Sequence, residues 1–275
     1  MRNFTILILF GMLLGSLSKV SAQVEKKEEF SPAIEDNSFL IEEAYNQEER
    51  VVQHISNLMY VPQIPSSYFY TFTQEWPVGG QLNQLSYTIP LTFIRNGSSG
   101  LGDIMINYRY QLLGHDDWAA ASPRLSLIFP TGSSEKGLGT GGYGLQVNLP
   151  FSKRLTEKFA AHFNLGATAL FPKYTDADGN ETRKLLPSYF WGGSLIWLTT
   201  SNFNFLFEYL NQINGSFDEK GGVAFENVHI INPGVRFAIN LNRLQIVPGL
   251  SVPINIYKDN TYVDSFFYLS FEHPF

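Results

Sequence analysis

The stretch that decides the fold is Gly102-Asp-Ile-Met-Ile-Asn-Tyr-Arg-Tyr-Gln-Leu-Leu113. Its even positions from Ile104 to Leu112 are apolar or aromatic, and most of its odd positions are polar. Successive side chains of a β-strand point to opposite faces, so this alternation predicts a strand with one apolar and one polar face. Residues 143–152 and 203–209 repeat the pattern.

About twelve such segments follow one another along the chain, and an even number of strands of about ten residues is typical of bacterial outer-membrane barrels. The sequence therefore predicts an all-β fold, an antiparallel transmembrane β-barrel over residues 50–275. The expected strands span residues 50–60, 67–77, 81–94, 102–113, 119–131, 142–154, 159–171, 186–199, 202–213, 227–240, 244–256 and 263–275.

The links between these segments alternate in length, as the barrel prediction requires. Outer-membrane barrels have short turns on the periplasmic side and longer loops outside. The short links are 156–158, 200–201 and 241–243, and the long ones are 132–141, 172–184 and 214–226. This alternation predicts that both ends of the barrel chain lie in the periplasm.

A soluble β-sandwich would show the same alternation of residues along its strands. Large aromatic residues near the segment ends favour the membrane barrel, because they match the aromatic girdles of such proteins; they include Trp76, Tyr108, Tyr110, Trp191, Trp197 and Tyr209. Prolines inside the segments predict bulges or kinks; they are Pro90, Pro123, Pro150, Pro233 and Pro248.

The N-terminus predicts export. Residues 1–22 combine an early Arg2, an apolar stretch and the small-residue end Val20-Ser21-Ala22, which is typical of a cleaved signal peptide. Residues 23–49 are expected to form an acidic periplasmic lead, in which Ser38 could cap a short helix over residues 39–47. This piece could lie in the lumen as a plug, although a lead resting against the rim is the preferred interpretation.

Composition narrows the class of protein. Only 16% of the 275 residues are charged, 15% are aromatic and none is cysteine, so disulfides and a lipidated N-terminal cysteine are excluded. A net charge of −6 lacks the basic excess that nucleic acids require. The remaining expected partners are outer-membrane lipids, the machinery that inserts barrels, and an unidentified small solute.

On the predicted register, the inward face carries both signs of charge, which favours a neutral or amphipathic solute over an ion. A narrow pore and an interior blocked by paired side chains remain equal alternatives, because about twelve strands is an intermediate barrel size. The predicted lumen residues are Glu75, Asp103, Asn107, Arg109, Arg124, Gln146, Asn148, His162, Asn164, Glu208, Asn232, Arg236 and Glu272.

The last strand has the form of an insertion signal for outer-membrane barrels. Phe267, Leu269, Phe271 and the terminal Phe275 are expected on one face. Such an alternating strand ending in phenylalanine looks like the signal that these proteins present to their insertion machinery.

Catalysis has one weak candidate. His54 and Ser56 lie at i and i+2, on one strand face, where the imidazole could accept the hydroxyl proton. The string resembles the H-x-S-N motif of outer-membrane phospholipases, but Leu58 stands where their pattern has glycine. A lipid hydrolase is therefore the alternative, a non-conducting structural barrel a third, and neither metal nor cofactor is expected.

Five strings together resemble the outer-membrane transporter family labelled "MetA-pathway of phenol degradation". The resemblance covers about residues 38–275 and implies a Gram-negative outer-membrane barrel that passes small, hydrophobic or aromatic compounds. It implies no catalytic residues. The strings are Ser38–Gln47, Phe72–Val78, Gln84–Pro90, Gly102–Gln111 and Pro123–Gly132.

Overall fold

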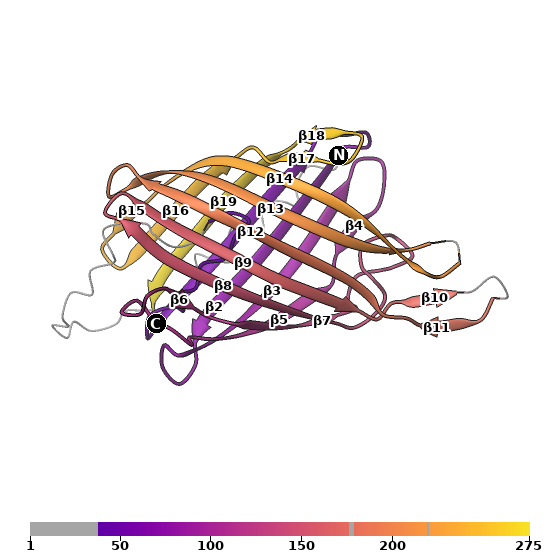
Figure 1. Cartoon of the computed structure of the whole chain (residues 1–275), viewed down its shortest axis with the longest axis horizontal. Helices are drawn as coiled ribbons and strands as arrows, with labels where there is room; N and C mark the ends of the chain where they lie inside the picture. Colours follow the sequence, from indigo (N-terminus) through magenta and orange to yellow (C-terminus); the bar gives the residue numbers. More distant parts are fainter. Residues whose placement is uncertain (1–37, 176–178, 219) are drawn as a thin grey trace, which may run out of the picture.

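The computed structural model describes residues 38–175, 179–218 and 220–275, so the predicted signal peptide lies outside the described residues. Within these ranges the chain forms a closed antiparallel β-barrel (Figure 1). No helix in the described ranges is long and apolar enough to cross a membrane. The expected all-β barrel fold is confirmed.

Twelve segments cross the barrel wall in chain order, and a separate hairpin of β10 (Lys173–Thr175) and β11 (Glu181–Arg183) projects from one end (Figure 1). Several segments are interrupted and carry two labels. The wall consists of β1 (Val51–Val61), β2 (Ser67–Pro77), β3 (Asn83–Ile94), β4 (Ser99–Leu101) with β5 (Ile104–Tyr110), β6 (Ala120–Ala121) with β7 (Arg124–Phe129), β8 (Gly144–Thr156), β9 (Phe159–Leu170), β12 (Leu186–Leu198), β13 (Phe203–Phe217), β14 (Val223–Phe237) with β15 (Ile239–Leu241), β16 (Leu244–Ser251) with β17 (Ile254–Ile256), and β18 (Thr261–Val263) with β19 (Ser265–Pro274).

The first and last strands close the barrel. β1 pairs with β19 from Val51 opposite Pro274 to Tyr60 opposite Ser265, and its other edge pairs with β2. The Phe275 N–H donates to the Arg50 carbonyl at 2.8 Å. Because Gln245 at the start of β16 pairs with Glu272, the C-terminus lies at the barrel end that also carries the turn between β15 and β16 (Figure 1).

The two faces of the wall differ as the alternation predicts. On β8, Leu145, Val147 and Leu149 are 41–47% exposed on the outside of the barrel. Their neighbour Asn148 points inward and is 1% exposed. The outer face is therefore an apolar surface, and the inner face of this strand is polar.

Inner faces elsewhere differ from that expectation, because part of the lumen is filled with apolar side chains. Ile196, Leu206, Val247 and Phe266 are at most 4% exposed and pack in one interior cluster. At these positions the strands are apolar on both faces, so period-2 alternation alone does not reveal this cluster. The interior is a packed core at this level of the barrel.

Three of the interruptions in the wall strands lie opposite prolines. Gly102, Ser122 and Val252 donate their N–H groups to the carbonyls of Pro90, Pro150 and Pro233 at 2.8, 3.2 and 3.1 Å. A proline has no N–H to return the second bond, so the facing strand leaves the ladder there. At Pro90, Pro150 and Pro233 the irregularity thus occurs in the partner strand, and the strand that holds the proline is continuous. At Pro123 the predicted irregularity lies in the strand itself, which is interrupted between β6 and β7.

One predicted loop is wrong. Residues 214–226 were expected as a long link, but the ladder between β13 and β14 continues to Phe217 opposite Val223. The expected loop 172–184 does link β9 to β12, and it contains the β10–β11 hairpin. Cross-strand pairing extends β13 and β14 beyond the point where alternation stops, because backbone hydrogen bonds need no apolar face.

Candidate functional site

Residues 38–47, called the inner segment below, lie inside the barrel. The helix expected over residues 39–47 is absent, since the segment consists of bends and extended chain. Its contacts are with inward side chains from β13 round to β1, instead of the rim contacts of a periplasmic lead. The backbone N–H and C=O groups of the inner segment make few hydrogen bonds with one another, so side chains of the barrel wall supply their hydrogen-bond partners.

Glu208 holds the start of the inner segment. Its Oε1 atom accepts the N–H groups of Phe39, Leu40 and Ile41 at 3.0, 2.9 and 3.1 Å. Its Oε2 accepts from Asn232 Nδ2 at 2.6 Å. One fully buried carboxylate thus binds three successive backbone donors, the arrangement in which charge strengthens each hydrogen bond.

Glu42 and Arg124 form an ion pair in the middle of the segment. Arg124 Nη2 lies 2.7 Å from Glu42 Oε1, and its Nε donates to Oε2 at 2.9 Å. The Glu42 backbone N–H and carbonyl both bond with the Asn164 amide, at 2.9 and 2.7 Å. Burial opposes ionisation, but Arg124 and Arg109 outweigh it and lower the pKa of Glu42 below its ordinary value. The ion pair therefore joins the middle of the inner segment to β7.

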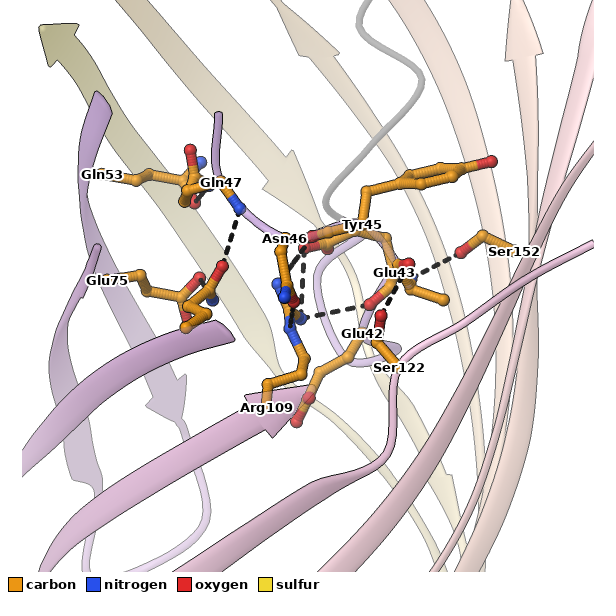
Figure 2. Close-up of polar contacts among 12 residues, drawn as sticks. Glu42, Glu43, Tyr45, Asn46, Gln47, Gln53, Glu75, Arg109, Ser122 and Ser152 are labelled. Carbon is orange, nitrogen blue, oxygen red and sulfur yellow. Dashed lines mark hydrogen bonds and ion pairs between the residues drawn. The ribbon is translucent and has the colours of Figure 1, made fainter. Parts of the chain in front are cut away.

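Arg109 fastens the second half of the inner segment (Figure 2). Its Nε donates to Asn46 Oδ1 at 3.0 Å and its Nη2 to the Tyr45 carbonyl at 2.7 Å. Its Nη2 also lies 3.4 Å from the Glu43 carboxylate, and both side chains are about 95% buried. Such a buried pair is costly to break, because the remaining charge is left without a partner.

Small polar side chains of the wall complete the seat, by which we mean the set of wall side chains that bind the inner segment. The Ala44 N–H donates to Ser152 Oγ at 2.6 Å, and Ser122 Oγ donates to the Ala44 carbonyl at 2.9 Å. The Gln47 N–H donates to Gln84 Oε1 at 2.7 Å. These wall residues were not among the predicted lumen residues, although the alternation places them on inward faces.

Phe39 anchors the segment by packing. Its ring lies 5.7 and 5.6 Å from the rings of Phe266 and Tyr268. A Cβ atom at Gly234 or Gly249 would lie 2.5 Å from the Phe39 ring. Glycine at these two strand positions makes the space that the ring fills.

The predicted lumen residues lie mostly within this network. Asp103 is the exception, because its carboxylate accepts the Gly132 N–H at 3.0 Å and the Thr140 N–H at 2.7 Å and so holds a loop. Those that contact the inner segment directly are Arg109, Arg124, Asn164 and Glu208. Those that bond to other wall side chains are Glu75, Asn107, Gln146, Asn148, His162, Asn232 and Glu272, and Arg236 is fully buried.

The catalytic candidates are not joined to each other. Ser56 Oγ bonds with Tyr70 Oη at 3.1 Å, while the His54 ring stacks on Phe72 and His273. No hydrogen bond between His54 and Ser56 occurs in the described part of the chain. The expected insertion signal lies on the outer face, where Phe267 is 47% and Phe275 67% exposed, with Leu269 and Phe271 half-buried.

A cavity of about 560 Å³ lies beyond Leu40, toward the barrel end opposite the C-terminus. Its apolar and aromatic lining includes Leu40, Met59, Phe69, Ile230, Tyr257 and Tyr262. Gln63, Asn255 and Asp264 are among its polar lining residues. Leu40 and Met59 line this cavity and also pack against the apolar cluster around Phe39.

Comparison with known proteins supports the fold. No family model and no curated protein sequence matches the chain, so the resemblance to the phenol-degradation family stays a prediction. The COG4313 outer membrane channel from Pseudomonas putida F1 is similar in structure, with a TM-score of 0.62 at 10% identity over 84% of this chain and 98% of that one. The NanC porin has a TM-score of 0.50 at 10% identity over 82% and 100%. The chain thus has the barrel fold of outer-membrane channels.

Proposed function

We propose that the protein is a passive outer-membrane channel for small molecules with an apolar or aromatic body, closed in this conformation by the inner segment. The observation that carries the proposal is the inner segment itself, seated across the lumen next to an apolar cavity. A purely structural barrel needs neither a cavity nor a hydrogen-bonded segment beneath it.

The outer surface of the barrel supports the proposed location in the outer membrane. The exposed apolar band would face outer-membrane lipids, and the closing strand would present Phe275 to the insertion machinery. Residues 1–22 would direct export and be removed. An enzymatic role has no support from the separated His54 and Ser56.

A redox lock tests whether the inner segment is the gate. The Ser38 and Ser194 hydroxyl oxygens are 2.5 Å apart, and the chain has no cysteine, so the double variant Ser38→Cys/Ser194→Cys offers a single disulfide. We expect oxidation to reduce the open-channel current in planar bilayers at least tenfold, and a reductant to restore it. The matched control is Ser38→Cys alone, which oxidant should leave unchanged.

Two outcomes would contradict the proposal. Equal currents in the oxidised and reduced double variant would mean that the inner segment is not the gate. Absence of current in both states, and in the wild type, would favour the structural barrel.

Solute preference is measured as the block of the open-channel current by an added solute. We expect block by a small aromatic alcohol and not by a sugar of similar size.

A further inference from the structure

The cavity beyond Leu40 contains two buried acceptors that lack donors. Asp264 is 7% exposed, and its Oδ2 accepts from Asn255 Nδ2 at 2.8 Å. In the part of the chain that the structure describes, Asp264 Oδ1 and Gln63 Oε1 have no hydrogen-bond donor, and the Gln63 side chain neighbours the Asp264 carboxylate. Buried polar atoms are rarely left unpaired, because losing water without a new partner is costly.

The surroundings of these acceptors are apolar. Met59, Phe69 and Ile230 line the same cavity, as do the rings of Tyr257 and Tyr262, which lie 5.6 Å apart in an edge-on arrangement. The volume of about 560 Å³ lies in the range of sites for small organic ligands. Aromatic faces beside a carboxylate attract an organic cation through both charge and ring quadrupole.

No lysine or arginine belongs to the described lining, and Lys258 lies exposed in the adjacent turn. The cavity thus offers acceptors and negative charge without a positive side chain. An anionic ligand would meet repulsion from Asp264, and a pure hydrocarbon would leave both acceptors unpaired.

We propose that this cavity is a binding site for a small organic amine, whose ammonium group donates to Asp264 and Gln63 while its apolar body lies among Met59, Phe69 and the two tyrosines. The proposal rests on the proposed channel function, because the amine is the class of solute that the channel would admit. It goes further than the channel proposal because it names Asp264 as the carboxylate that recognises the solute.

Equilibrium binding tests the site without requiring conduction. The probe is 4-fluorobenzylamine, observed by fluorine NMR in the purified protein and in empty micelles of the same detergent. We expect saturable line broadening with the protein only. The uncharged 4-fluorobenzyl alcohol should bind at least tenfold more weakly, and 4-fluorobenzoate should show no saturable binding.

Two variants assign the binding to the cavity. Asp264→Asn should weaken amine binding at least tenfold, because it removes the charge that strengthens the hydrogen bond. Asp259→Asn is the matched control, since Asp259 is exposed in the neighbouring turn, and should change binding less than twofold. Met59→Trp should abolish binding by filling the space.

Each outcome decides the proposal. Equal binding of amine and alcohol, or unchanged affinity in Asp264→Asn, would overturn it, provided that the variants keep the heat-dependent gel mobility of a folded barrel. If the wild-type protein does not bind the amine but the double cysteine variant still shows a redox-dependent current, the binding site is overturned and the channel proposal stands. Saturable amine binding without current in any state would support the site and reject the channel.

Discussion

Replacing Glu208 by alanine is expected to open the barrel. The change removes one acceptor that binds the N–H groups of Phe39, Leu40 and Ile41. Each buried donor left without a partner costs about 1–3 kcal/mol, so the seated state should lose about 3 kcal/mol or more. Since about 1.4 kcal/mol is a factor of ten, we expect the open population to rise about 100-fold or more, measured as single-channel open time in planar bilayers.

Two further variants make the Glu208 result specific. Glu208→Gln keeps an oxygen acceptor and loses only the charge, so it should fall between the wild type and alanine. Glu226→Ala, on the exposed end of the next strand, should conduct like the wild type. Unchanged gating in Glu208→Ala, with normal gel mobility of the folded barrel, would show that these hydrogen bonds do not hold the channel closed.

An arginine in place of Val147 is expected to destabilise the membrane-embedded barrel by about 2–4 kcal/mol. Val147 is 47% exposed on the outer face of β8, midway in sequence between the exposed rings of Tyr143 and Phe151. These rings are eight residues apart, or about 26 Å along the strand, which at a tilt of about 40° spans about 20 Å of the roughly 25 Å apolar band. The measurement is reversible urea unfolding in lipid vesicles.

The matched control for Val147→Arg is Val223→Arg. Val223 is also exposed, at 37%, but it lies at the tip of the extended β13–β14 hairpin, beyond the expected apolar band. The cost there should be about 0–1 kcal/mol, because it falls with distance from the bilayer centre. Equal costs at the two positions would mean that β8 does not face lipid at Val147.

The position next to Val147 shows that an inward side chain is not automatically a solvated one. Asn148 is 1% exposed, and its Nδ2 donates to Asn164 Oδ1 at 3.2 Å. Asn164 in turn holds Glu42 of the inner segment. A larger side chain at Asn148 would therefore disturb the hydrogen bonds that hold the inner segment. The inward direction of Asn148, which the alternation gives, does not reveal these contacts.

The sequence by itself determined the strands, their number and the outward face, because a period of two is a local property that each strand carries. Gly102–Leu113 and 143–152 reveal it without any partner strand. The same alternation identified Arg109 and Glu208 as inward residues. It could not say what they bind.

The tertiary structure alone decided the path of residues 38–47. These residues lack a repeating pattern, so the capping signal at Ser38 suggested a helix. Their backbone groups find partners such as Asn164 and Glu208, which are 122 to 169 positions away in the chain. Such partners become neighbours only when β1 pairs with β19 and the wall closes, so the physical reason is barrel closure and not local propensity.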